Sequence, residues 1–286
     1  MEKQRTLIFV GAHPDDESIC VGATLAYYAE AGVKVYYVCA TRGEVGQAKP
    51  EKMKGYSTLG DLRSSELQCA AQVLGLTDVI HLGFRDSGMT GWEENKHPLA
   101  LASAPLEQVV GRIVAIFRKL KPDVVITFDP IGGYSHPDHI VTHNATVKTF
   151  FAAGDRKQYP ETGPSFQPQK LYFNVTPRRL LRMEVRVSSF LGRDMHKVGR
   201  NKNVDLAAIT ANNFPVNAVI RPTEKAVQAR ERAMLCHASM LSCVSPSYSI
   251  FSLLDKLFGY KEYYMRAYPP VKSWLREHDL FNGIKK

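Results

Sequence analysis

Cysteine is scarce in this sequence and is not arranged for metal binding. The five cysteines are odd in number, none of them forms a C-x-x-C pair, and Cys20, Cys39 and Cys69 lie among apolar neighbours. Cysteines in such surroundings behave as small buried hydrophobic side chains. The pattern argues against a cysteine-rich zinc site and against a disulfide scaffold, and it favours a reducing compartment.

Long apolar runs are missing as well. No run approaches the length of a membrane-spanning helix, and acidic residues interrupt the N-terminal region before a signal-length apolar segment is complete. We therefore expect a soluble, cytoplasmic protein without a membrane span. The apolar share of 44% is ordinary for a globular protein. The net charge of +9 suits anionic partners without identifying one.

Apolar segments alternate with helical patterns through the first half of the chain. Strands are expected at 6–12, 33–40, 78–84 and 122–130. Helices are expected at 18–32, 60–76, 105–121 and 136–154. Strands that are apolar throughout and separated by helices are typical of a parallel sheet covered on both faces. Residues 1–154 therefore predict a Rossmann-like open α/β sheet, mostly parallel, with Asp61 as the N-cap of the second helix.

The second half, residues 155–286, is less regular. A strand is expected at 170–177, a helix at 222–240 and a late strand at 260–270. We expect these elements to complete the same sheet and to form a wall of the site, so that residues 1–286 make one domain. The Arg-rich segment 178–202 is interpreted as a solvated face, and it has the charge to accept an anionic group.

Two His-Pro-Asp motifs follow predicted strands of the sheet. His13 and Asp16 come after the first strand, and His136 and His139 come after the fourth. Proline is favoured at the first position of a helix, and residues three apart in a first turn share a face. Both motifs lie at carboxyl ends of parallel strands, where open α/β sheets bind their ligands. The two corners are therefore expected to converge on one point.

Histidine and carboxylate groups gathered at such a point indicate a divalent metal site. Catalytic zinc commonly takes three nitrogen or oxygen ligands and leaves a position for water. A cation would also neutralise acids that otherwise repel one another. Asp15, between His13 and Asp16, would be left free as a general base. Helix capping without a metal is the alternative interpretation of a His-Pro-Asp motif. It would suffice for one such corner, but two corners on separate turns favour a metal site.

Spacing alone does not rank the histidines of the second corner. His139 and His143 are four residues apart, which is also a workable metal pair on a helix. On this argument His136, His139 and His143 remain equal candidates.

Five motifs follow one another through the first half of the chain: AHPDDE (12–17), TRGEVG (41–46), LRSSEL (62–67), LGFRDSGM (82–89) and GGYSHPDH (132–139). In these motifs the sequence resembles the LmbE-like (PIG-L) family of metal-dependent N-acetylglucosamine deacetylases. The RDSGM segment is similar to the branch that acts on mycothiol and related glucosaminides. After about residue 150, only HAS (237–239) and YYMRAYPP (263–270) resemble family features.

The resemblance implies a role for each residue of the site. Zinc, or another divalent metal such as Fe²⁺, would be held by His13, Asp16 and His139, which selects His139 over His143. Asp15 would act as general base. His136, oriented by Asp138 and assisted by Tyr134, would stabilise the oxyanion or protonate the leaving amine. The residues expected to contact the sugar are Arg63, Asp86 and Glu44.

The supporting residues also have plainer interpretations. Without the resemblance, Arg63 is a solvated helix charge, Asp86 a turn residue and Glu44 a loop acid. Glu17 is expected only to favour the positive end of a helix. His237 is expected to be a packed core histidine.

Together these residues predict a zinc-dependent hydrolase that removes an N-acyl group, most simply acetyl, from a small glucosamine-containing molecule. One alternative is an amidase or deacylase of a larger glucosaminide conjugate or glycosylated natural product. Another, suggested by two histidines and one carboxylate, is a non-haem iron oxygenase. A nucleotide- or nucleic-acid-binding module is disfavoured, because acids replace the G-x-G-x-x-G phosphate loop. Nucleic acid is therefore not expected as a partner, and a homo-oligomer is left open.

Overall fold

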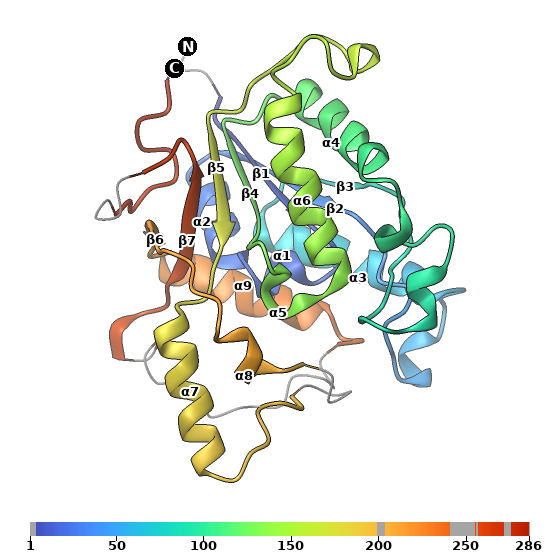
Figure 1. The fold of residues 1–286 in the computed structure, drawn as a ribbon, viewed down its shortest axis with the longest axis vertical. Coiled ribbons are helices and arrows are strands. Elements are labelled where there is room, and N and C mark those ends of the chain that lie inside the picture. The colour runs from blue at the N-terminus through green and yellow to red at the C-terminus, as the bar shows by residue number, and fades with distance from the viewer. Residues whose placement is uncertain (1–3, 199–203, 241–254, 256, 272–275, 286) are drawn as a thin grey trace.

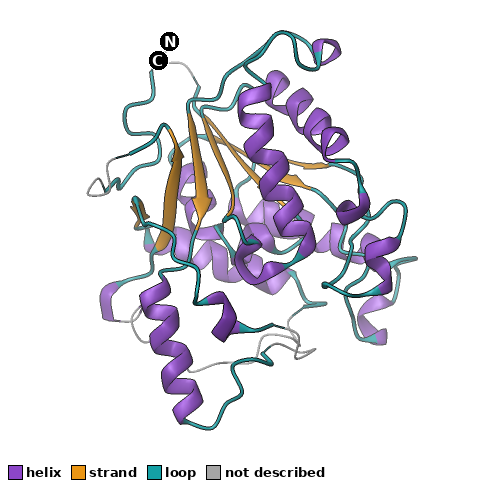
Figure 2. Cartoon of the chain, viewed as in Figure 1, coloured by secondary structure: helices purple, strands orange, loops and turns teal. Residues whose placement is uncertain are grey.

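A seven-stranded sheet forms the centre of the protein (Figures 1 and 2). The computed structural model of the chain describes residues 4–198, 204–240, 255, 257–271 and 276–285. The strands are β1 (Thr6–Gly11), β2 (Lys34–Cys39), β3 (Asp78–His81), β4 (Val124–Phe128), β5 (Lys170–Asn174), β6 (Ala218–Ile220) and β7 (Glu262–Tyr268). Their spatial order is β3-β2-β1-β4-β5-β7-β6. Neighbours from β3 to β5 pair in parallel, and β7 is antiparallel to β5 and β6. The predicted, mostly parallel α/β sheet is confirmed.

Both faces of the sheet are buried beneath helices (Figure 1). Successive residues of a strand point to opposite faces, so Leu7 and Phe9 of β1 enter one core and Ile8 and Val10 the other. The helices α2 (Gly22–Glu30), α3 (Leu59–Leu74) and α9 (Glu224–Cys236) pack together on the first side, and α4 (Leu106–Leu120) and α6 (Pro137–Ala152) cover the second. This double burial explains why the strands are apolar throughout.

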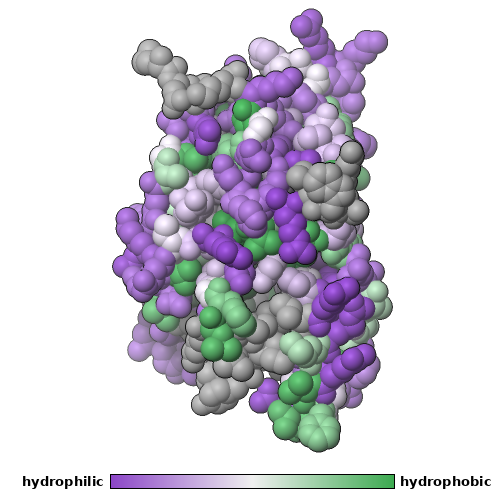
Figure 3. Space-filling model, turned by 90° about the vertical axis from the view of Figure 1, so that its left-hand side faces the viewer, coloured by the Kyte–Doolittle hydropathy of each residue, from purple (hydrophilic) through white to green (hydrophobic). Residues whose placement is uncertain are grey.

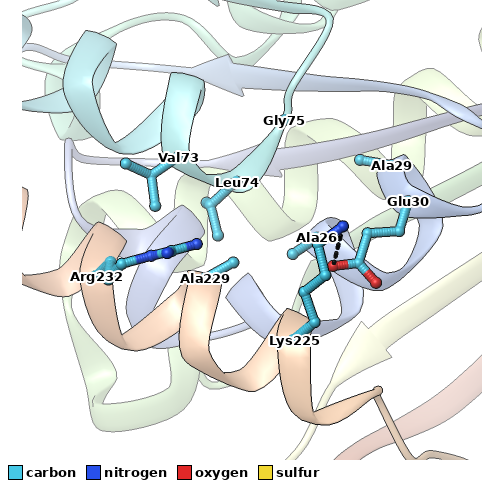
Figure 4. A pocket seen from close by; sticks show the side chains of 9 residues that line it. All are labelled: Ala26, Ala29, Glu30, Val73, Leu74, Gly75, Lys225, Ala229 and Arg232. Carbon is cyan, nitrogen blue, oxygen red and sulfur yellow. Dashed lines mark ion pairs between the residues drawn. The ribbon is translucent and has the colours of Figure 1, made fainter.

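The helices α2, α3 and α9 leave a cavity of about 240 Å³ between them (Figure 4). Small side chains such as Ala26, Ala29 and Ala229 line it, and Glu30 pairs with Lys225 at 3.8 Å across its mouth. This cavity lies at the C-terminal ends of α2 and α3. The C-terminal end of α9 points the other way, toward the carboxyl ends of the strands.

Two details of the predicted helices are wrong. The helix expected over 18–32 is two helices, α1 (Asp16–Ile19) and α2. The N-cap of α3 is Thr58, whose side chain accepts the backbone N–H of Asp61 at 3.1 Å, while the carboxylate of Asp61 accepts the N–H of Thr58 at 3.1 Å. Asp61 is therefore the third helical residue of a capping box and not the cap itself.

The second half of the chain completes the sheet with β5 and β7, as predicted, and with β6, a strand that was not predicted. Two helices there were not predicted, α7 (Arg178–Phe190) and α8 (Leu206–Ile209), and both lie beyond the carboxyl end of the sheet (Figure 1). The remaining short elements are α5 (Gly132–Ser135) and the 3₁₀ helices Pro50–Met53, Glu93–Lys96, Leu101–Ser103 and Pro160–Thr162. Among the described residues, no helix is long and apolar enough to cross a lipid bilayer.

The Arg-rich segment 178–202 is only partly the solvated face that was predicted, and its residues 199–202 lie outside the described ones. Arg178 is buried, and its guanidinium lies 3.1 Å from the carboxylate of Asp129, just after β4. At the other end of α7, Phe190 is 91% exposed. Figure 3 shows apolar side chains gathered toward the lower end of a face that is otherwise mostly hydrophilic.

A disulfide joins Cys69 of α3 to Cys236 of α9, with the two Cα atoms 5.8 Å apart. The expectation that Cys69 is a free core thiol, and the argument against disulfides, are therefore wrong for this pair. The two cysteines are 167 residues apart in sequence, so no local spacing signals the bond. Cys20 and Cys39 are free, and Cys243 lies outside the described residues.

Reduction of this disulfide is expected to lower the free energy of unfolding by about 2–4 kcal/mol, because the bond restricts the unfolded chain. Urea unfolding with and without a phosphine reductant measures the difference. The Cys69→Ser variant should show the same loss and no further response to reductant. Equal stability of the oxidised and reduced wild type would contradict the bond.

Candidate active site

The first His-Pro-Asp motif forms a sharp corner between β1 and α1. One carboxylate oxygen of Asp16 accepts the backbone N–H groups of Ala12 at 2.9 Å and of His13 at 2.8 Å. Asp15 has a φ of 124°, a strained conformation for a residue with a Cβ atom, costing on the order of 1–3 kcal/mol. Its N–H donates to the carboxylate of Glu17 at 2.9 Å. The corner is therefore held by hydrogen bonds that its own backbone N–H groups donate to its own carboxylates.

The second motif begins α6, where Pro137 is the first helical residue as predicted. The same expectation is wrong for Pro14, because α1 begins at Asp16 with Asp15 as its N-cap. Gly132 precedes the second motif with a φ of +64°, and a Cβ atom there would lie 2.7 Å from the Cβ of His139. Only glycine allows this close approach. The ring of His139 stacks on Phe128 at the end of β4, with ring centroids 3.9 Å apart. The turn after β4 thereby fixes the direction of His139.

The two corners bring the side chains of His13, Asp16 and His139 together. His13 Nδ1 lies 3.2 Å from His139 Nε2, Asp16 Oδ1 lies 3.4 Å from His139 Nε2, and Asp16 Oδ2 lies 3.8 Å from His13 Nδ1. All three residues are buried. Ligand atoms of a tetrahedral zinc site with bonds of about 2.0–2.2 Å are separated by about 3.3–3.6 Å. The two distances to His139 Nε2 lie close to this range, while the 3.8 Å distance is longer and involves the other oxygen of Asp16. The nitrogen and oxygen donors are of the kind that a divalent metal takes.

The second ring nitrogen of His13, Nε2, faces two carboxylates that fix the orientation of the ring. His13 Nε2 lies 3.1 Å from a carboxylate oxygen of Asp138 and 3.5 Å from one of Asp86. A proton on Nε2 leaves the lone pair of Nδ1 free, the arrangement that metal-binding histidines commonly take. Burial would lower the pKa of His13, but Asp86, Asp138 and Asp16 outweigh it and raise the pKa. The same negative charge would attract a cation.

Other groupings overlap with this one. Among the described residues, two groups offer one ligand atom per residue within 4.8 Å of one another: His13, His136 and His139, and His13, His136, Asp86 and Asp138. Asp16 is in neither group. His143 is in neither group, because its Nδ1 lies 2.8 Å from the carbonyl oxygen of Phe128. The structure thus brings His139, and not His143, to His13 and Asp16.

Asp15 lies beside these donors. Its carboxylate is 3.1 Å from the guanidinium of Arg63. Burial raises the pKa of Asp15 to about 6, with the charge of Arg63 acting in the opposite direction and that of Asp16 in the same direction. A carboxylate with a pKa near neutrality is well suited to accept and return a proton.

His136 is held through a backbone amide. Its Nδ1 accepts the N–H of Asp138 at 3.2 Å, so the ring carries its proton on Nε2. The carboxylate of Asp138 makes no hydrogen bond to His136. It accepts hydrogen bonds from the backbone N–H of Ser87 at 2.9 Å, from the hydroxyl of Ser87 and from Nε2 of His13. Burial, together with His13 and His139, lowers the pKa of His136 to about 2. His136 is therefore a neutral N–H donor, and the carboxylate of Asp138 orients His13 instead.

Tyr134 stands at the open side of the site. Its ring meets those of His139 and His136 edge-on, with centroids 5.0 and 5.8 Å apart, and the residue is 36% exposed. A cavity of about 370 Å³ continues from this point. Its lining consists of Met89, Thr90, Tyr134, Ser135, Asp205, Ala208, Ile209 and Asn212. The site therefore opens toward α8, where part of a substrate can be accommodated.

Arg63 is buried behind the first corner, unlike a solvated helix charge. Its guanidinium donates to the carbonyl oxygen of Pro14 at 2.6 Å and to that of Gly43 at 3.0 Å, besides pairing with Asp15. A Cβ atom at Gly43 would lie 1.9 Å from this guanidinium. In this structure Arg63 braces the corner that carries Asp15, and its contact with a sugar stays a prediction.

Glu44 and Asp86 brace two neighbouring loops. Glu44 accepts the N–H of Asp86 at 3.0 Å, and Asp86 accepts the N–H groups of Gly88 at 2.8 Å and Val45 at 3.3 Å. Both carboxylates thus hold loop backbone around the site. Their predicted contact with the sugar is likewise still a prediction.

Glu17 and His237 form a buried pair beside the first corner, which was not predicted for either residue. Glu17 is fully buried, and its carboxylate lies 2.7 Å from Nε2 of His237, a pair separated by 220 residues. His237 is buried, as expected of a core histidine, but it has a charged partner. The only signal that could have linked them is the family-like HAS motif.

Comparison with known proteins gives a family and a fold. Residues 8–150 match the model of the PIG-L family, described as GlcNAc-PI de-N-acetylase. A 1D-myo-inositol 2-acetamido-2-deoxy-alpha-D-glucopyranoside deacetylase from Streptomyces scabiei is 35% identical over 294 residues, covering 97% of this chain and 89% of the relative. The predicted class, a deacetylase of a glucosaminide, agrees with the name of this relative.

Two solved structures share the fold at low identity. The N,N'-diacetylchitobiose deacetylase from Pyrococcus horikoshii aligns with a TM-score of 0.63 at 19% identity, covering 93% of this chain and 84% of the other. A 4-carboxy-2-hydroxymuconate hydratase from Pseudomonas putida aligns with a TM-score of 0.53 at 17% identity, covering 94% and 98%. Because these two enzymes differ in chemistry, the likeness concerns the fold alone. The family model and the 35% identical relative, which spans almost the whole chain, establish that this protein belongs to the PIG-L family.

Proposed function

We propose that the protein hydrolyses the N-acetyl group of a glucosamine linked to a polyhydroxylated aglycone such as inositol, with zinc as the metal. The observation that carries the proposal is the approach of the His13, Asp16 and His139 side chains to within 3.2–3.8 Å of one another, in a corner that also carries Asp15. The aglycone follows from the name of the Streptomyces relative. The cavity beyond Tyr134 supplies room for it.

In this proposal His13, Asp16 and His139 hold the metal. When bound there, a divalent cation lowers the pKa of water and polarises an amide carbonyl. Asp15 accepts a proton from the hydrolytic water while the water oxygen bonds to the acetyl carbon. Asp15 then delivers that proton to the amine as the C–N bond breaks, leaving acetate and the free glucosamine. A pKa near 6 lets one carboxyl group do both.

His136 and Tyr134 stabilise the charge that develops on the carbonyl oxygen. His136 carries its proton on Nε2, because Nδ1 accepts from the backbone, and this N–H is available as a donor. Tyr134 adds a hydroxyl at the open side. This favours the oxyanion role of His136 over its role as proton donor to the amine. Asp138 contributes by fixing the tautomer of His13, and Arg63 by fixing the corner of Asp15.

A panel of substrates tests the proposal. Acetate release should be fastest from N-acetylglucosaminyl inositol, slower from free N-acetylglucosamine, and slowest from a glucosaminide with a long N-acyl chain. Release of a large acyl group in preference to acetate would favour the alternative amidase. Turnover that consumes oxygen would favour the iron oxygenase.

A further inference from the structure

We propose that His237 is a positioning residue for the general base, acting on Asp15 through the carboxylate of Glu17. The inference rests on the proposed function, since it concerns how Asp15 is held. His237 comes from the far end of the chain, directly after α9, and it reaches the first corner across 220 residues of sequence.

Glu17 links the two residues with its two carboxylate oxygens. Oε2 accepts the backbone N–H of Asp15 at 2.9 Å, and Oε1 lies 2.7 Å from Nε2 of His237. The hydroxyl of Ser18 also donates to Oε1, at 2.6 Å. Each oxygen of a fully buried carboxylate therefore has its own partner. A carboxylate held at both ends has one orientation, and that orientation fixes the N–H of Asp15.

Asp15 needs such support because its backbone is strained. A φ of 124° is rarely adopted by residues with a Cβ atom, and it persists only where neighbouring groups enforce it. In this conformation the Asp15 carboxylate lies 3.1 Å from the guanidinium of Arg63. Without the hydrogen bond from its N–H to Glu17, Asp15 is expected to relax and to displace its carboxylate.

The segment that carries His237 is itself fixed to α3. Cys236 is bonded to Cys69, and Ser239 donates its N–H and its hydroxyl to the carboxylate of Glu66, at 2.7 and 2.6 Å. The helix α9 is also seated against α2 and α3 along its length (Figure 4). His237 therefore has a rigid base from which to hold Glu17. The helix α3 carries Arg63 as well, so both supports of Asp15 share one framework.

A double-mutant cycle tests whether His237 acts through Glu17. His237→Ala should lower kcat about 10- to 100-fold, the size of effect expected from a misplaced catalytic group, with KM within about twofold and metal content unchanged. Glu17→Ala should lower kcat at least as much. Because the two residues act in series, the double variant should be no slower than Glu17→Ala alone. His237→Gln, which keeps an N–H donor, should recover part of the loss.

Three results would overturn the inference. They are an unchanged kcat in His237→Ala, a rise in KM alone, and fold losses that multiply in the double variant. A rise in KM alone would mean that His237 contacts the substrate, and losses that multiply would mean that His237 acts independently of Glu17. If Glu17→Ala does not fold, Glu17→Gln replaces it in the cycle under the same expectation.

Two comparisons separate this inference from other causes. His278→Ala removes a histidine bonded to the carbonyl oxygen of Val219 at the far margin of the sheet, and it should lower stability without changing kcat. A wild-type protein that releases no acetate would refute the proposed function. Acetate release that is lost in Asp15→Asn but kept in His237→Ala would refute only the positioning role.

Discussion

Asp15→Asn is expected to lower kcat about 10²- to 10⁴-fold, the usual contribution of a general base, while the protein keeps its metal. Asparagine has the size of aspartate but cannot accept a proton. The three proposed ligands are other residues, so metal content should stay at the wild-type level. Steady-state acetate release and elemental analysis of the same preparation measure both quantities.

Asp155→Asn is the matched control for this substitution. Asp155 lies in the loop after α6, at the opposite end of that helix from His139. Its substitution should leave kcat unchanged. Turnover of Asp15→Asn above about a tenth of the wild-type rate would show that another group takes the proton.

His139→Ala is expected to weaken metal binding by more than about 100-fold, since even a residue behind a ligand contributes 10- to 100-fold. The side chain supplies the nitrogen that lies 3.2 Å from His13 Nδ1 and 3.4 Å from Asp16. Activity should fall with the loss of metal. Competition with a chromogenic chelator gives the metal dissociation constant of each variant.

His143→Ala provides the control for His139→Ala on the same helix. Both histidines are buried in α6, and His143 is bonded to the carbonyl oxygen of Phe128. Its loss should lower stability and leave the metal dissociation constant within about threefold of the wild type. Loss of metal from His143→Ala, or its retention by His139→Ala, would reassign the ligand.

The parts of the site that follow from local sequence could be predicted. A strand, a turn and a helix start are encoded within a few residues, so both His-Pro-Asp corners and their meeting point at the carboxyl ends of β1 and β4 were expected. The choice of His139 over His143 came from the resemblance to the family. In the structure His139 stacks on Phe128 and its Nε2 lies 3.2 Å from His13 Nδ1, whereas His143 is bonded to the carbonyl oxygen of Phe128. The ligand role of His139 stays a prediction.

Contacts between distant segments could not be predicted from the residues. Glu17 and His237 are 220 residues apart, and Cys69 and Cys236 are 167 residues apart. Nothing in the surroundings of either partner specifies the other, and only the packing of α9 on α3 brings them together. The burial of Arg63 could not be predicted for the same reason. Its place on a helix does not indicate that its guanidinium contacts Pro14 and Asp15, about 50 residues earlier in the chain.

Titration of the metal-free protein with zinc tests the central claim most directly. Acetate and free amine released from N-acetylglucosaminyl inositol would be measured at each zinc concentration. The account predicts that both products appear in equal amounts and that the rate rises in proportion to bound zinc, up to about one ion per chain. Full occupancy of the His13, Asp16 and His139 site without release of acetate would contradict it.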